Sequence, residues 1–122
     1  MKKSMKKFSF FLLTIVAATT LAWCGTTPST SYSRGSIDTF AQCLTDAGAK
    51  MFGLATCSHC QKQKALFGTS FAKINYTDCK ENPNACSSLN TVPTWQFKDG
   101  TQLVGEQSFA TLSAKTSCAL PK

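Results

Sequence analysis

Histidine is scarce in this sequence: the single one, His59, lies between Cys57 and Cys60. Covalent haem attachment needs a histidine directly after the second cysteine of such a pair, and Gln61 stands there, so that kind of site is excluded. A structural zinc site needs a second closely spaced pair of ligands, which the sequence lacks. Zinc bound by His59, the two flanking cysteines and one distant thiol stays open as the weaker alternative.

The sequence also lacks a cluster of basic residues interleaved with aromatic ones, the pattern of nucleic-acid-binding surfaces. Four of the 13 lysine and arginine residues lie near the N-terminus, which leaves nine against six acidic residues, so the formal net charge of +7 overstates the charge of the rest. We therefore expect an ordinary solvated surface and no nucleic-acid partner.

The apolar run of the N-terminal segment, Phe8 to Ala22, is shorter than the roughly 20 residues of a membrane span. Lysines precede it and small residues follow it, which is typical of an export signal. We expect residues 1–23 to be this signal and the rest of the chain to be extracytoplasmic, in the periplasm or cell envelope. An uncleaved anchor helix is the alternative.

The stretch from Leu21 to Cys24 resembles a bacterial lipobox, in which the signal is cut before a cysteine that carries lipid. Trp23 departs from this pattern because a small residue normally precedes the cysteine, so cleavage after Ala22 is the alternative. We expect a lipid anchor at Cys24 and a flexible tether rich in Thr, Ser and Pro over residues 24–35.

Residues 36–122 are predicted to form one small α/β domain with a mixed four-stranded sheet flanked by helices. The helix at Cys57 begins at the carboxyl end of a strand, where α/β folds usually hold their chemistry. The predicted elements are a helix capped by Ser36 and ended by Gly48, a strand at 50–55, a helix opened by Cys57 and stopped by Gly68, a strand at 73–78, an irregular segment at 82–90, strands at 94–97 and 102–104 joined by the turn Asp99-Gly100, and a helix capped by Ser108 that ends near Cys118.

The seven cysteines indicate disulfides, because setting Cys24 aside leaves an even number in an exported chain. A disulfide between Cys57 and Cys60 closes too small a loop to be a structural staple, since it removes little chain entropy. A reactive dithiol is the better interpretation of this pair.

The start of a helix favours an anion and lowers the pKa of a cysteine from about 8.5 into the range of roughly 3.5–7.5. Cys57 is therefore the predicted nucleophile and Cys60 the resolving thiol. His59 adds to the stabilisation of the thiolate when it is protonated or donating; an exposed loop residue is the alternative. This chemistry requires no cofactor and no metal.

The cysteine pair at a strand–helix junction, followed about thirty residues later by "TVPTW", resembles the thioredoxin superfamily. That resemblance implies a thioredoxin-like fold, a cis peptide before Pro93 and a Val92 backbone that pairs with a substrate strand. More closely, "GAKMFGLATCSHCQKQKALFG" (48–68) with "VPTWQFKDG" (92–100) resembles the thioredoxin-like domain that is fused to, or partners, bacterial vitamin K epoxide reductase homologues. The closer resemblance implies protein thiols of exported proteins as substrates and a vitamin K epoxide reductase-type membrane protein that reoxidises the chain.

Two positions depart from the thioredoxin pattern. Met51 stands where thioredoxins usually have a buried aspartate, and Thr56 stands where they have a tryptophan. A histidine directly before the second cysteine is what strongly oxidising members of the superfamily use. The resemblance therefore implies an oxidant rather than a general reductase.

Two further disulfides are expected, Cys43–Cys118 and Cys79–Cys86. In the chain-entropy model they contribute about 4.5 and about 2.5 kcal/mol, because the first closes a much longer loop. The related vitamin K-type domains similarly have a cysteine pair in the region of Cys79 and Cys86. Free buried thiols are the alternative for the first pair, and a regulatory or relay role is the alternative for the second.

Taken together, these patterns predict a membrane-tethered, extracytoplasmic thiol–disulfide oxidoreductase that oxidises exported proteins. A disulfide reductase or isomerase supplied with electrons from the membrane is the second hypothesis. A non-enzymatic lipoprotein that binds a metal or a partner through the same face is the third.

Overall fold

The computed structural model describes residues 31–122. The predicted export signal, the predicted lipid site at Cys24 and most of the predicted tether lie outside these residues. None of the helices between residues 31 and 122 has the length and the apolar character that crossing a bilayer requires.

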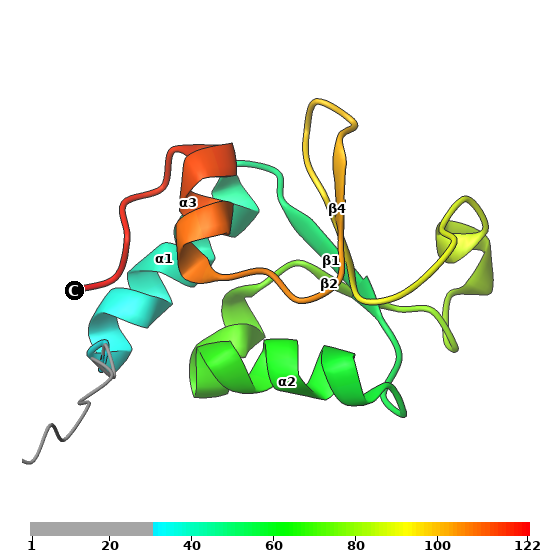
Figure 1. Ribbon diagram of the computed structural model, residues 1–122, viewed down its shortest axis with the longest axis horizontal. Coiled ribbons are helices and arrows are strands. Elements are labelled where there is room, and N and C mark those ends of the chain that lie inside the picture. The colour runs from blue at the N-terminus through cyan, green and yellow to red at the C-terminus, as the bar shows by residue number, and fades with distance from the viewer. Residues whose placement is uncertain (1–30) are drawn as a thin grey trace, which may run out of the picture.

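The described residues form helices around four short strands (Figure 1). The order of α-helices and strands is the one that the sequence predicts, and the structure adds two 3₁₀ helices, η1 and η2. The elements are α1 (Arg34–Asp46), β1 (Lys50–Gly53), α2 (Ser58–Phe67), η1 (Gly68–Lys73), β2 (Tyr76–Asp78), η2 (Pro83–Cys86), β3 (Thr94–Gln96), β4 (Gln102–Val104) and α3 (Phe109–Thr116).

The sheet has the strand order β2-β1-β3-β4. β1 and β2 are parallel, with Met51 opposite Tyr76, and α2 lies on the connection between them. β3 is antiparallel to both of its neighbours, with Trp95 opposite Met51 on one side and Leu103 on the other. The predicted α/β class with a mixed four-stranded sheet is therefore confirmed. The connection from β1 places the start of α2 at the carboxyl end of β1.

An aromatic cluster joins the three α-helices to the sheet. The ring centroid of Phe67 in α2 lies 6.4 Å from that of Phe40 in α1 and 5.0 Å from that of Phe109 in α3. It also lies 6.1 Å from that of Trp95, which is fully buried and so belongs to the core. Each such ring contributes about 1.5–3 kcal/mol by leaving water. The helices accordingly gather on one side of the sheet in Figure 1, and the cluster fixes α2 there.

α1 begins before the predicted position. Its N-cap is Ser33, whose hydroxyl accepts a hydrogen bond from the N–H of Ser36, whereas the sequence favours Ser36 itself as the cap. Tertiary contacts explain the difference: the Tyr32 ring packs on Phe109 with 5.4 Å between centroids, and the Ser33 N–H donates to the Lys122 carbonyl at 3.2 Å. These contacts hold residues that the sequence assigns to the tether.

The segment after α2 also differs from the prediction. Gly68 ends α2 as predicted, with a φ of 56°, but the chain continues as η1 instead of entering a strand at residue 73. Ile74 is buried, and its N–H donates to the Phe71 carbonyl at 2.9 Å, which closes η1. β2 therefore begins only at Tyr76.

The Cys43–Cys118 disulfide joins α1 to the segment after α3, with the partners expected from the sequence. Cys118 is buried, and its carbonyl accepts a hydrogen bond from the Ser113 hydroxyl at 2.6 Å. The last residue, Lys122, accepts a bond from the Ser36 hydroxyl at 2.8 Å, which places the C-terminus beside the start of α1 (Figure 1). This end of the molecule lies opposite the start of α2 in that view.

Candidate active site

Cys57 is the N-cap residue of α2. Its Sγ accepts a hydrogen bond from the Cys60 N–H at 3.3 Å, at the position where the first N–H groups of a helix lack backbone partners. The Cys57 N–H in turn donates to the Leu54 carbonyl at 3.2 Å, which fixes the turn after β1. Cys57 is partly exposed, whereas Cys60 is buried. The structure thus presents one thiol to solvent and holds the other in the interior.

The Cys60 sulfur lies against the end of β1. A Cβ on Gly53 would come within 3.2 Å of this sulfur, so the close approach depends on the missing side chain. Burial raises the pKa of Cys60 to about 11, and its hydrogen bond with the Cys57 side chain acts in the same direction. Cys60 therefore keeps its proton near neutral pH.

The pKa of Cys57 is lowered, although its partial burial opposes ionisation. Hydrogen bonds from the Cys60 thiol and from the backbone N–H groups of Cys60 and His59 outweigh that burial, while the negative charge of Glu106 works against them. The cause is the one expected from the sequence, because N–H groups at the start of a helix solvate an anion. The reduced pair combines a readily ionised, accessible thiol with a buried, protonated one.

Val92 and Pro93 form the loop that faces Cys57. The Val92–Pro93 peptide is cis, as the resemblance to thioredoxins implies. The Val92 carbonyl accepts a hydrogen bond from the Cys57 thiol at 3.8 Å, and the Pro93 carbonyl accepts one from the Gly105 N–H at 2.8 Å. Within residues 31–122, neither the Val92 N–H nor its carbonyl pairs with another backbone group. Its main chain beside the reactive sulfur is therefore open to an added strand.

The His59 side chain makes its polar contact with Glu106 and not with a cysteine. Its Nδ1 lies 2.6 Å from Oε1 of Glu106, and its imidazole is 66% exposed. The backbone N–H of His59, in contrast, contributes to the ionisation of Cys57. Sequence reasoning found His59 but missed Glu106, which lies 47 positions further along, because no spacing rule links two such distant residues.

Gln63 ties the segment that carries Glu106 to α2. It is 1% exposed, its Oε1 accepts a hydrogen bond from the Gln107 N–H at 2.5 Å, and its Nε2 donates to the Gln107 carbonyl at 3.2 Å. A buried amide needs both kinds of partner, and one backbone residue supplies them. Because Gly105 is bonded to Pro93, the residues on both sides of Glu106 are anchored to active-site elements.

Tyr76 lies on the buried side of the active site, beside Cys60. Burial raises the pKa of Tyr76 to about 12, the negative charge of Asp78 acts in the same direction, and the hydroxyl donates to Asp78 Oδ2 at 3.4 Å. Nζ of Lys64 lies 3.9 Å from the centroid of the tyrosine ring. Tyr76 therefore stays protonated at neutral pH and acts as a wall beside Cys60.

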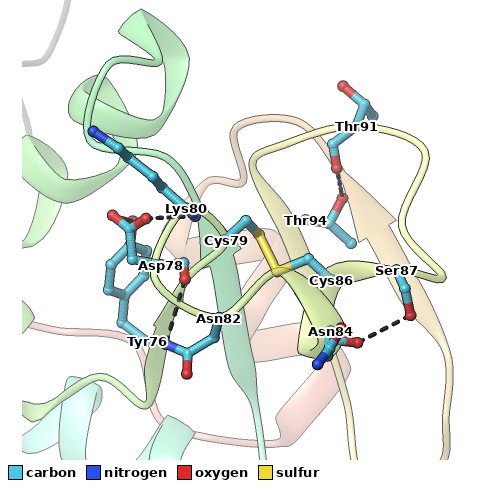
Figure 2. The surroundings of a disulfide bond; sticks show 10 residues. All are labelled: Tyr76, Asp78, Cys79, Lys80, Asn82, Asn84, Cys86, Ser87, Thr91 and Thr94. Atoms are coloured by element: carbon cyan, nitrogen blue, oxygen red, sulfur yellow. Dashed lines mark hydrogen bonds between the residues drawn. A yellow bond between two sulfur atoms is a disulfide. The ribbon is translucent and has the colours of Figure 1, made fainter.

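The second disulfide, Cys79–Cys86, has the partners expected from the sequence and lies just after β2 (Figure 2). Hydrogen bonds order the chain on both sides of it: the Lys80 N–H donates to Asp78 Oδ1 at 2.9 Å, and the Thr94 hydroxyl donates to the Thr91 carbonyl at 2.8 Å. In Figure 1 this segment, with η2, lies on the opposite side of the view from α1 and α3.

A pocket of about 230 Å³ lies beside this disulfide. Both cysteines of the disulfide line it, together with Leu54 from the turn before Cys57 and Val92 from the cis-proline loop. The second disulfide is thus one wall of a hollow that reaches the open main chain of Val92.

The arrangement is suited to thiol–disulfide exchange. It offers an accessible thiol of lowered pKa, a second thiol one helical turn away, and an unpaired main-chain segment beside them. Among residues 31–122 there is no group of three or more His, Cys, Asp or Glu side chains that could hold a metal ion.

Comparison with known proteins identifies a related oxidoreductase. No protein-family model matches the chain. The chain is 36% identical over 91 residues to Thiol-disulfide oxidoreductase LTO1 of Arabidopsis thaliana, a match that covers 66% of this chain and 24% of LTO1. The chain therefore spans about a quarter of the length of this relative.

Proposed function

We propose that this chain, a thioredoxin-like protein similar in sequence to a thiol–disulfide oxidoreductase, is itself an extracytoplasmic oxidoreductase that donates the Cys57–Cys60 disulfide to exported proteins. The single observation that carries the proposal is the difference between the two thiols. The pKa of Cys57 is lowered and that of Cys60 is raised to about 11.

The reaction balances as a two-electron exchange. A substrate thiolate attacks the Cys57 sulfur, the Cys57–Cys60 bond breaks, and Cys60 leaves and takes up a proton. The second thiol of the substrate then loses its proton and attacks the mixed disulfide, which releases Cys57 as a thiolate. The substrate dithiol has become a disulfide, and the chain holds the two electrons as a dithiol.

The pKa difference favours this direction. In thiol–disulfide exchange a thiol of lower pKa leaves faster, so the step that releases Cys57 and completes the substrate disulfide is favoured. The competing reaction is attack of Cys60 on the mixed disulfide, which requires the Cys60 thiolate. With a pKa of about 11, this thiolate is scarce near neutral pH. Stabilising the Cys57 thiolate also stabilises the reduced chain, which makes its disulfide a stronger oxidant.

The surroundings of Cys57 support a peptide substrate. The main chain of Val92, which pairs with no other backbone group among residues 31–122, lies beside the reactive sulfur and can pair with an extended segment. The pocket between Leu54, Val92 and the Cys79–Cys86 disulfide lies next to that path and can receive a neighbouring side chain.

The partner and the location belong to the same proposal. A donor of disulfides must be reoxidised, and a vitamin K epoxide reductase-type membrane protein, which passes two electrons to quinone, is the proposed acceptor on the resemblance of residues 48–68 and 92–100. A lipid at Cys24 would hold the domain at the membrane surface, where this exchange takes place.

The reduction potential tests the proposed direction. We expect the Cys57–Cys60 pair, equilibrated with glutathione, to be more oxidising than thioredoxin at about −270 mV. A value at or below that of thioredoxin would favour the reductase or isomerase. Oxidative refolding of a reduced substrate gives the activity, and Cys57→Ser should abolish it while Cys43→Ala/Cys118→Ala should retain the chemistry. Unchanged activity in Cys57→Ser would exclude the catalytic role of the Cys57–Cys60 pair.

The Cys60→Ala variant identifies substrates. Without its resolving thiol the chain should accumulate mixed disulfides through Cys57, and their partners can be identified by mass spectrometry. We expect exported proteins with paired cysteines and the membrane partner; a Cys57→Ala/Cys60→Ala variant is the control for adventitious disulfides.

A further inference from the structure

The side chains of His59 and Glu106, beside the active site, take no part in the bond-breaking steps described above. His59 lies in the first turn of α2, two residues after Cys57, and Glu106 lies between β4 and α3. Their Nδ1 and Oε1 atoms are 2.6 Å apart, and their side chains are 66% and 40% exposed. The proximity joins the only histidine of the chain to a carboxylate from a different element.

The position of Glu106 is built into the fold rather than left to a mobile side chain. The residue before it, Gly105, donates its N–H to the Pro93 carbonyl at 2.8 Å. The residue after it, Gln107, is held through both backbone groups by the buried amide of Gln63. The main chain at Glu106 is therefore fixed to the cis-proline loop on one side and to α2 on the other.

We propose that Glu106 is a positioning residue: its carboxylate holds the His59 imidazole at the start of α2, and together the two side chains set the reduction potential of the Cys57–Cys60 pair. This inference rests on the proposed function and adds to it a residue that moderates the oxidising power of the site. His59 alone would leave an unopposed positive charge near the reactive sulfur whenever it is protonated. Glu106 cancels that charge.

The direction of the effect follows from counting charges. Replacing Glu106 with glutamine removes one negative charge, and the imidazole can lose at most one proton in response. The pair in the variant is therefore never more negative than in the natural chain, whatever the protonation of His59. A less negative surrounding stabilises the Cys57 thiolate, hence the reduced form, so the disulfide becomes more oxidising. The same carboxylate opposes ionisation of Cys57 in the structure.

Glutathione equilibria of the full chain test this inference. We expect Glu106→Gln to shift the equilibrium toward the reduced protein by about two- to tenfold, the range of charge interactions near a protein surface. A tenfold change equals about 30 mV for a two-electron couple. Titration of the Cys57 thiolate by its ultraviolet absorbance should move to lower pH in parallel.

Glu81→Gln is the matched control, because Glu81 is exposed and its side chain makes no hydrogen bond or ion pair among residues 31–122. It should leave both the equilibrium and the titration unchanged. Thermal unfolding of the oxidised proteins separates a shift in potential from a loss of stability. If Glu106 had a purely structural role, its replacement would lower the stability and leave the potential unchanged.

A double-mutant cycle with His59→Gln tests the pairing. The shift caused by Glu106→Gln should differ between the natural and the His59→Gln backgrounds, because the carboxylate contacts the imidazole in the first and has no such partner in the second. Three results would each overturn the inference: additive effects of the two substitutions, a Glu106→Gln shift no larger than that of Glu81→Gln, or a shift toward a more reducing potential. The glutathione equilibria require only a reversible disulfide. They can therefore refute the role of Glu106 while disulfide donation to substrates persists, and they can support that role even if donation to substrates is refuted.

Discussion

Gly53 is the residue at which one added carbon tests the packing of the active site. It ends β1, pairs with Asp78 of β2 and accepts a hydrogen bond from the Cys79 N–H at 2.9 Å. In Gly53→Ala the new Cβ would lie 3.2 Å from the Cys60 sulfur and 3.1 Å from Cε2 of Tyr76. The sulfur is fully buried, and the tyrosine is held by Asp78, so neither neighbour can retreat freely.

Overpacking of this kind costs about 1–3 kcal/mol. The smaller entropy of the unfolded chain returns about 0.4–1 kcal/mol, because alanine has fewer accessible backbone conformations than glycine. We therefore expect Gly53→Ala to lower the free energy of unfolding by about 1–2 kcal/mol after this offset. Gly35→Ala is the matched control: Gly35 lies in α1, and a Cβ there would meet no atom within 4 Å. It should leave stability unchanged or raise it.

Urea denaturation measures the cost. All variants should carry Cys57→Ala, so that the active-site disulfide cannot form and both structural disulfides stay oxidised without added reductant. Adding Cys60→Ala removes the crowded sulfur, and the cost of Gly53→Ala should fall markedly in that background. A cost no greater than that of Gly35→Ala, or one that Cys60→Ala leaves untouched, would refute the argument that Gly53 makes room for the resolving thiol.

Three further predictions follow from the same contacts. In the reduced protein Cys57 should be alkylated at a lower pH than an ordinary thiol, because its pKa is lowered, whereas Cys60, with a pKa of about 11, should react only under strongly alkaline conditions. Equal labelling of the two at neutral pH, found by peptide mapping with mass spectrometry, would contradict this. Replacing both Cys43 and Cys118 with alanine should lower the free energy of unfolding, measured by urea denaturation, by up to about 4.5 kcal/mol, because the disulfide closes a loop across most of the domain. A loss below about 1 kcal/mol would contradict the chain-entropy account. Gln63→Leu should lower stability by about 1–3 kcal/mol, because the N–H and carbonyl of Gln107 lose their partner, while Gln63→Glu should retain part of the contact. Equal stability of the two variants would argue against a role of these hydrogen bonds.

Local signals made the core of the site predictable. A cysteine at a helix start can be identified because the cap position needs an acceptor, and Cys57 fills it. Asp99-Gly100 predicted the turn between β3 and β4, and the structure has Gly100 at a φ of 79° with Asp99 Oδ1 accepting from the Thr101 N–H. In each case a few adjacent residues contain the physical cause, so one sequence is sufficient.

The features that the sequence did not reveal depend on distant residues. Ser33 and Ser36 are equally good caps, and only the packing of Tyr32 and the bond to Lys122 select the first. Gln63 is a polar residue on a helix, which usually faces solvent; its burial depends on a backbone segment 44 positions away. The contact of His59 with Glu106 is of the same kind. Such pairings follow from the fold and have no spacing signature.

Met51 connects this packing to the direction of the chemistry. It occupies the place where thioredoxins usually have a buried aspartate, and it is fully buried opposite Trp95. The charges that act most strongly on Cys60 are those of Cys57 and Lys64. Met51 itself offers no group that could accept the Cys60 proton.

In a mixed disulfide the sulfur of Cys57 is bonded to the substrate, so it too cannot take that proton. Tyr76, with a pKa of about 12, is already protonated and is no base at neutral pH. Attack by Cys60, which would return the substrate in its reduced form, then proceeds without the proton acceptor that an aspartate at position 51 would provide. The second thiol of a substrate does not depend on this proton. Under the proposed direction, methionine at position 51 slows the resolving step of a reductase, so Met51→Asp should raise the rate of insulin reduction. An unchanged rate in a folded Met51→Asp variant would show that the proton of Cys60 does not control the direction.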